Sequence, residues 1–249
     1  MLGGADNDGL GTLGGEALQR LVVYGEDASR VSKQLLDGEL AGQHIVFFRA
    51  GHLRVPPTMP EALQRCGYLF DSSFTAPDVL TNFPYALPLG LGFDEDSGIL
   101  EFPLTFEDEE TPRLDQRVAS ALEVIRANAE NAAISVILIH TNEAHYKLKA
   151  EEDLLNQLPP AVIAIDAVSF ARFWHARDRL KWTITPSKVA SDIRLTVTTE
   201  EPIEGLTFEF RRHVQSVDGD ATLAESRRQI VLHPLKAGDS LSVDIRYAE

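Results

Sequence analysis

An arginine and a histidine stand just after a short apolar run, HIVFF, in the first quarter of the chain. Arg49 follows the run directly, and His52 lies in the loop that comes next. A strand-end arginine can bind a carboxylate through two parallel hydrogen bonds, and a histidine that titrates near neutral pH can act as a general acid or base. Arg49 and His52 are therefore candidate functional residues. The alternatives are a structural ion pair for Arg49 and hydrogen bonds to backbone carbonyls for His52.

A second pair, His140 and Asn142, follows the longest apolar run, ISVILI. Active sites of open α/β sheets and of barrels gather at the carboxyl ends of strands, so this position favours the same acid–base chemistry. The same structural alternatives apply. His145 lies five residues beyond His140, which is not the spacing of two ligands on a helix, and no HxxxH or HExxH motif occurs in the chain. We therefore predict no metal site built wholly within this chain.

Strands and helices alternate through the first part of the chain, which would deliver these side chains to one edge of a sheet. Helices are predicted at 26–36, 60–65, 112–131 and 150–158, and after the capping residue Asp166. Buried strands are predicted at 44–48, 68–70, 99–105, 134–139 and 161–165. Repeated units of this kind predict a mainly parallel α/β domain over residues 26–180.

The hydrophobic period changes near Leu180. From Trp182 onward, apolar and polar residues alternate in short stretches separated by Pro, Gly and Asp turns. We predict a small all-β, sandwich-like module of about five to seven strands over residues 181–249. Residues 1–25 begin with MLGGADNDGLGTLGG and are predicted to be a flexible, glycine-rich lead-in.

The stretch 71–106 is rich in Pro, Gly, Asn and Asp and is predicted to be mostly loop. Long loops in compact domains often carry function, so DSSFTAPDVLTNFPY is a candidate wall of a binding cleft, with Tyr85 as a candidate substrate contact. A connector packed by its own aromatic side chains is an equally good interpretation. The acidic run Glu107–Glu110 is predicted to be a solvated loop, because blocks of like charge repel one another and stay hydrated.

Composition limits the classes of partner. The chain has 38 acidic and 23 Lys and Arg residues, a net charge of −15, which repels nucleic acid and anionic membranes. The single cysteine, Cys66, excludes an intramolecular disulfide and leaves the compartment open. No apolar stretch is long enough for a membrane span, and the N-terminus does not have the pattern of a secretory signal. We expect a soluble protein of undetermined location.

The segment FFRAGHLRVPPTMPEALQRCGYLFDSSFTA, followed by ISVILIHTNE, resembles the later part of the polysaccharide deacetylase family, carbohydrate esterase family four. Strand, arginine, loop, short helix ending in Gly-Tyr, Asp-Ser-Ser and a strand ending in Leu-x-His occur in the family's order, over roughly residues 26–177. The resemblance implies a distorted β/α barrel. It also implies a metal-activated water that removes acetyl groups from N-acetylated sugars of a polysaccharide or oligosaccharide.

The resemblance maps three residues of this chain onto catalytic roles. Arg49 corresponds to the arginine that orients the catalytic base, Asp71 to the aspartate that tunes the catalytic histidine, and His140 to the general acid. The family has a proline and an aromatic residue soon after the arginine, whereas this chain has Ala50, Gly51 and His52, which indicates a variant subfamily. His52, Asn142 and Tyr85 are the candidate substrate contacts.

The upstream motifs of the family are missing. Members begin this domain with paired aspartates and a His-x-x-x-His motif that supply the base and the ligands of a divalent metal, with zinc the expected ion. Neither motif precedes Glu26, and Asp6 and Asp8 have no apolar strand before them. We expect an incomplete barrel, from an N-terminally truncated deacetylase whose complete form is active. The alternative is a non-catalytic carbohydrate-binding or interaction protein on the same scaffold.

Overall fold

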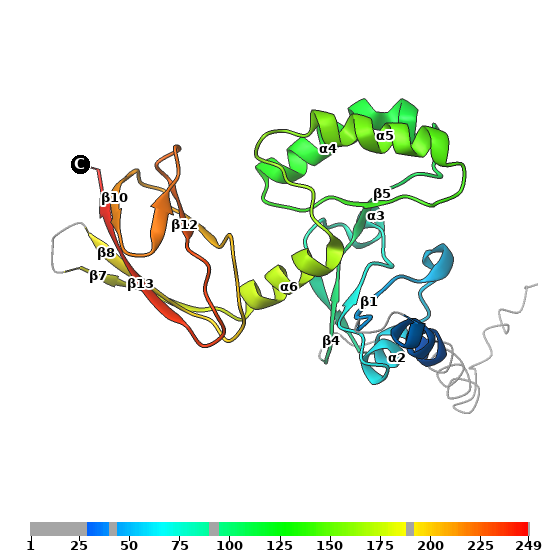
Figure 1. Cartoon of the computed structure of the whole chain (residues 1–249), viewed down its shortest axis with the longest axis horizontal. Helices are drawn as coiled ribbons and strands as arrows, with labels where there is room; N and C mark the ends of the chain where they lie inside the picture. Colours follow the sequence, from blue (N-terminus) through cyan, green and yellow to red (C-terminus); the bar gives the residue numbers. More distant parts are fainter. Residues whose placement is uncertain (1–28, 40–43, 90–94, 188–191, 249) are drawn as a thin grey trace, which may run out of the picture. The chain divides into compact units, whose positions relative to one another are not determined.

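The computed structural model describes residues 29–39, 44–89, 95–187 and 192–248 and divides the chain into two compact units, Met1–Ala164 and Ile165–Glu249 (Figure 1). The predicted lead-in, 1–25, lies outside the described residues. The division at 164/165, rather than the predicted 180/181, has a physical reason. Helix α6 (Ala167–Asp178) contributes Phe173 and Ala176 to the core of the second unit.

The first unit is mixed α/β and contains a four-stranded sheet in the order β1-β2-β4-β3. Strands β1 (Phe47–Phe48), β2 (Phe70–Asp71) and β4 (Asp96–Glu101) are parallel, and β3 (Tyr85–Pro88) pairs with β4 in the antiparallel sense. Helix α2 (Met59–Arg65) packs on this sheet. Its buried Leu63 joins a core with Tyr68, Leu87 and Ile99. Burial of such side chains stabilises the unit by about 1.5–3 kcal/mol each.

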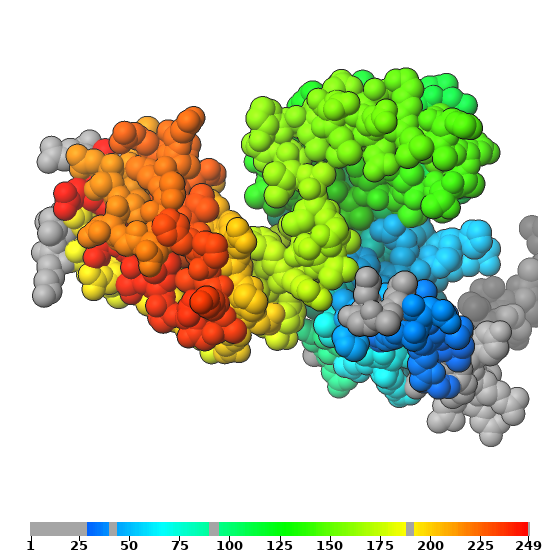
Figure 2. Space-filling model, viewed as in Figure 1, coloured from blue at the N-terminus to red at the C-terminus, as the bar shows by residue number. Residues whose placement is uncertain are grey.

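The first unit also contains a two-stranded parallel sheet of β5 (Leu104–Glu107) and β6 (Val136–Leu138). Helices α4 (Leu114–Glu130) and α5 (Ala144–Gln157) lie side by side over it (Figure 1), and their side chains form one continuous layer in the space-filling view (Figure 2). The buried residues of this second core recur at helical spacing and include Leu114, Val118, Leu122 and Ile125 of α4 and Ala150 and Leu154 of α5. A parallel bridge joins Leu104 of β5 to Thr75, the residue that precedes the short helix at 76–79.

Several predicted elements are confirmed. The helices predicted at 60–65 and 112–131 correspond to α2 and α4. Gly67, just beyond α2, has φ of +76°, a backbone conformation that favours glycine. Asp166 caps α6 by accepting a hydrogen bond from the Ser169 N–H at 2.8 Å. A helix also covers residues 29–39, and the remaining short elements of this unit are η1 (Gly51–Leu53) and α3 (Ala76–Val79).

Two strand predictions are wrong. The single strand predicted at 99–105 is divided between β4 and β5, because Pro103 has no N–H to donate to a ladder and the Leu104 N–H donates to the Phe74 carbonyl. The strand predicted at 161–165 does not form. Ile163 in that stretch is 78% exposed, and the chain turns where Val162 N–H donates to the Pro159 carbonyl. An apolar run needs a partner strand, and this one has none among the described residues.

The second unit consists of α6 and two antiparallel sheets, in the orders β10-β13-β8-β7 and β11-β12-β9. Its described part has seven strands, within the predicted range: β7 (Lys181–Pro186), β8 (Ile193–Thr198), β9 (Thr207–Glu209), β10 (Val214–Asp218), β11 (Ala221–Leu223), β12 (Gln229–Leu232) and β13 (Ser240–Tyr247). Both sheets contribute to one core that includes Leu195, Ile230 and Ile245. No described helix has the length and apolar character needed to cross a membrane.

Candidate functional site

Polar side chains collect where the parallel strands of the first unit end. Arg49, Asp71 and Glu101 stand at the carboxyl ends of β1, β2 and β4, and Asp108 and His140 follow β5 and β6. In α/β proteins, ligands bind at the carboxyl ends of the parallel strands, which is where these side chains lie. The side chains form two groups, and within the described residues no hydrogen bond or ion pair joins one group to the other.

Arg49 ties neighbouring strand ends together. Its Nε donates to the Ser72 carbonyl and its Nη2 to Ser72 Oγ, both at 2.8 Å. Ser72 Oγ in turn donates to the Phe102 carbonyl at 2.7 Å. Burial lowers the pKa of Arg49, and the carboxyl groups of Asp71 and Glu101 oppose that shift. Nη1 makes no hydrogen bond to a described residue, so part of the guanidinium is left for another acceptor.

Asp71 and Glu101 form a buried acid pair, and neither residue is exposed to solvent. Asp71 Oδ1 accepts from Ser73 Oγ at 2.7 Å, and Glu101 Oε1 accepts from the Phe74 N–H at 3.0 Å. The other two oxygens, Asp71 Oδ2 and Glu101 Oε2, are buried without a described hydrogen-bond partner.

The acid pair holds a proton at neutral pH. Burial raises the pKa of Asp71, and burial together with the negative charge of Asp71 raises the pKa of Glu101 to about 9. One shared proton removes the repulsion between the two free oxygens. Tyr85, opposite Glu101 in the β3–β4 pairing, has a raised pKa because of its burial and the nearby carboxyl groups. The pair therefore supports the strand ends and is not accessible to substrate.

The second group, the histidine network, consists of His140, Asp108, Lys147 and Asn142. His140 Nδ1 lies 2.7 Å from Asp108 Oδ1, and the His140 backbone N–H donates to Asp108 Oδ2 at 3.1 Å. Asp108 is completely buried, whereas the His140 side chain is 42% exposed. A carboxylate only accepts hydrogen bonds, so Nδ1 carries the proton, and Nε2 is the nitrogen left for chemistry.

Lys147 completes the histidine network from α5. Its Nζ lies 2.5 Å from Asp108 Oδ2 and donates to Asn142 Oδ1 at 2.6 Å, and its side chain is only 2% exposed. Burial acts to raise the pKa of Asp108, but hydrogen bonds from Lys147 and His140 outweigh it and lower that pKa below its usual value. Burial acts to lower the pKa of Lys147, and contact with Asp108 raises it.

Of the six predicted site residues, four lie in or beside the two groups and two lie outside them. Arg49 and Asp71 lie in or beside the acid pair, and His140 and Asn142 belong to the histidine network. His140 is bonded to Asp108 and not to Asp71. Tyr85 packs in the core beside β4, and His52 is an exposed residue of η1 with φ of 55°.

Three residues of these groups were missed by the sequence analysis. The prediction that the run Glu107–Glu110 is a solvated loop is wrong for Asp108, which directly follows a strand and turns inward. Glu101 was missed because the sequence predicted one continuous strand over 99–105, which places Glu101 inside a strand and not at its carboxyl end. Lys147 had a signal that could have been used, because it recurs at helical spacing with Ala150 and Leu154 on the buried side of α5.

Comparison with known proteins does not assign a family. No family model and no curated protein matches the chain. One solved structure, described as a "putative polysaccharide deacetylase" from Mycobacterium smegmatis, is 18% identical, and the match covers 66% of this chain and 62% of that chain, with a TM-score of 0.45.

A second structure, a lactosyl-enzyme intermediate of endo-glycoceramidase II from Rhodococcus sp., is 14% identical, and the match covers 92% of this chain and 64% of the other, with a TM-score of 0.25. The chain spans less than two thirds of each of these proteins. Both TM-scores are below 0.5, so the similarities alone establish neither a family nor an activity.

Proposed function

We propose that the chain is part of a polysaccharide deacetylase-like hydrolase that removes N-acetyl groups from a glycan. The observation that carries the proposal is the histidine network: a half-exposed imidazole at a strand end, with Nδ1 fixed by a buried carboxylate. In this arrangement, water that has lost a proton to a catalytic base adds to the acetyl carbon. Protonated Nε2 then delivers its proton to the sugar nitrogen while the bond between that nitrogen and the acetyl carbon breaks, which releases acetate. The free amine leaves, and neutral imidazole remains.

Asp108 takes in this proposal the orienting role that the family resemblance gave to Asp71. Asp71 instead supports the strand ends as half of the acid pair. Arg49 keeps its proposed role, because Nη1 is available to hold the carboxylate of a catalytic base. Among the proposed substrate contacts, Asn142 already donates to Glu109 and accepts from Lys147, whereas His52 is exposed.

The divalent metal of such an enzyme would activate the attacking water. The described residues contain no group of three or more His, Cys, Asp or Glu side chains suited to hold a metal ion. They do not fit a complete metal site, so no step is assigned to a metal here.

Acetate release from an N-acetylglucosamine oligomer, measured with zinc added, tests the proposal. We expect the His140→Gln variant to lose activity by about a hundredfold or more, because it removes the proton donor. His145→Gln is the matched control, since His145 is an exposed histidine on the neighbouring helix α5. In a protein that releases acetate and contains this chain, equal activity with and without the His140→Gln change would refute the assignment.

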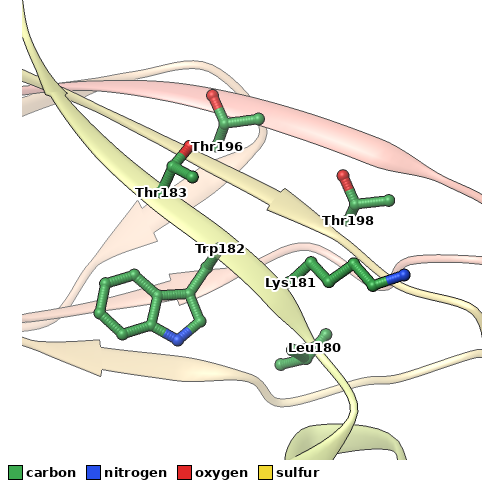
Figure 3. Close-up of a pocket in the computed structure, with 6 residues that line it drawn as sticks. All are labelled: Leu180, Lys181, Trp182, Thr183, Thr196 and Thr198. Carbon is green, nitrogen blue, oxygen red and sulfur yellow. The ribbon is translucent and has the colours of Figure 1, made fainter.

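A second function, non-catalytic glycan binding, is favoured by one feature of the second unit. A surface hollow of about 370 Å³ lies along β7 and β8, lined by Leu180, Lys181, Trp182, Thr183, Thr196 and Thr198 (Figure 3). The Trp182 side chain is 56% exposed, and exposed tryptophan rings can pack on sugars.

The geometry of the hollow also limits this second function. The Trp182 indole points away from the hydroxyl groups of Thr183 and Thr196 and contacts the Phe208 ring edge-on, with 6.1 Å between centroids (Figure 3). Saturable binding of the oligomer without acetate release, abolished by Trp182→Ala and kept in His140→Gln, would support the binding function over hydrolysis.

A further inference from the structure

Lys147 is a buried cation with two defined partners. Its Nζ contacts Asp108 Oδ2 and Asn142 Oδ1, while Asp108 Oδ1 is occupied by His140 Nδ1. The lysine and the imidazole therefore hold opposite oxygens of one carboxylate. The His140 backbone N–H adds a further hydrogen bond to Oδ2, so both oxygens of the Asp108 carboxylate are held in place.

Packing alone does not require a lysine at this position. Lys147 lies on the buried side of α5 with Ala150 and Leu154, where an apolar side chain of similar volume would fill the space. Burying an ammonium group has a large desolvation cost, and replacing a buried ion pair by packed apolar residues is often neutral or stabilising. The contacts of Lys147 therefore indicate a role toward Asp108 and, through it, toward the histidine.

We propose that Lys147 is a positioning residue that locks the Asp108 carboxylate in the orientation that selects the Nδ1–H tautomer of His140. The inference rests on the proposed function, in which Nε2 is the atom that serves the leaving nitrogen. Without the lysine, Asp108 can rotate, and its hydrogen bond to Nδ1 competes with the hydrogen bond to the His140 backbone. Glu109, whose carboxylate lies 3.7 Å from Nδ1, is too far away to replace Asp108 as the hydrogen-bond acceptor.

The ring nitrogens of His140 report this role directly. We would record ¹⁵N NMR spectra of the full chain with labelled histidine, at a pH high enough to leave the imidazole neutral, and assign His140 from the signal lost in His140→Gln. We expect the Nδ1–H tautomer to dominate in the unaltered chain. In Lys147→Met the ratio of tautomers shifts toward Nε2–H by about tenfold, the effect of weakening one charged hydrogen bond.

Lys149→Met is the matched control, because Lys149 lies on the same helix with a 67% exposed side chain paired to Asp153. It should leave the tautomer ratio unchanged. Lys147→Arg retains the positive charge and should keep the Nδ1–H form. If Lys147→Met does not fold by circular dichroism, Lys147→Gln replaces it, because it removes the positive charge at Asp108 Oδ2 but keeps a polar side chain; a smaller shift toward Nε2–H is expected, and an unchanged ratio in folded Lys147→Gln overturns the positioning role.

Two results would overturn the positioning role: an Nε2–H tautomer in the unaltered chain, or an unchanged ratio in folded Lys147→Met. The measurement uses neither substrate nor metal, so it is independent of the hydrolytic proposal. A tautomer shift without acetate release contradicts the function and leaves the positioning role intact. Acetate release that is insensitive to Lys147→Met contradicts the positioning role alone.

Discussion

The acid pair and the histidine network place carboxyl groups at equivalent strand ends with opposite electrostatic outcomes. Asp71, Glu101 and Asp108 are all completely buried. The pKa values of Asp71 and Glu101 are raised, whereas the pKa of Asp108 is lowered. The difference is the nearest partner, because the two acids face one another while Asp108 contacts the ammonium group of Lys147. Burial by itself does not determine the charge of a strand-end carboxyl group.

The two groups also differ in role: the acid pair stabilises the fold, whereas the histidine network can take part in a reaction. The acid pair shares a proton, is closed to solvent and braces the turn that holds Arg49. The histidine network is charged and presents one exposed ring. Groups whose environments drive their pKa values apart are the usual basis for assigning acid and base roles. Here only the histidine network offers a reacting atom to solvent.

The largest expected effect is on activity, at Asp108. Asp108→Asn removes the negative charge that orients His140, and acetate release should fall by about a hundredfold or more. Glu110→Gln is the control at an exposed carboxylate of the same acidic run, paired with Arg117 and outside the histidine network, and should change the rate by less than about threefold. Similar losses in both variants would show that net negative charge, rather than the Asp108 hydrogen bond, supports the reaction.

The next effect is on stability, at the acid pair. Glu101→Ala removes a buried group and leaves the Phe74 N–H without its acceptor, so the free energy of unfolding should fall by about 2–4 kcal/mol. Glu101→Gln should cost less than about 1 kcal/mol, because the side chain it replaces is already uncharged at pH 7. Urea unfolding compares them, and a Gln variant as unstable as the Ala variant would mean that Glu101 is ionised.

The two groups should respond to pH in opposite directions. Because the pKa of Glu101 is raised to about 9 in the folded chain, the folded state holds a proton that the unfolded state has released. The free energy of unfolding therefore falls as pH rises from about 5 to about 9, by up to about 1.4 kcal/mol per pH unit. Asp108, with its lowered pKa, contributes stability above its usual pKa that is lost as the pH falls through the lowered value.

Unfolding midpoints measured from about pH 2 to about pH 9 cover both windows and test the opposite responses. Glu101→Gln should flatten the alkaline part of the profile and leave the acidic part unchanged, whereas Asp108→Asn should affect the acidic part. An alkaline slope that persists in Glu101→Gln would place the proton on another group.

The smallest effect is expected at His52, beside Arg49 but in neither group. His52 has φ of 55°, a left-handed conformation that costs a non-glycine residue about 1 kcal/mol. His52→Gly should raise the free energy of unfolding by at most that amount. If His52 contacts the glycan, the same variant should raise KM severalfold with kcat unchanged, and an unaltered KM would remove it from the substrate contacts.

The sequence by itself determined the strand-end positions of Arg49 and His140, the helices α2 and α4 and the change to a β module, because these depend on local period, caps and turns. Only the tertiary structure decided which side chains contact one another in the two groups. Asp108 and His140 are 32 residues apart, and which member of an acidic run turns inward depends on strand register, since a shift of one residue reverses the face. Helix packing then brought Lys147 to the same carboxylate, and the charges assembled there, rather than residue type, decided which acids are ionised.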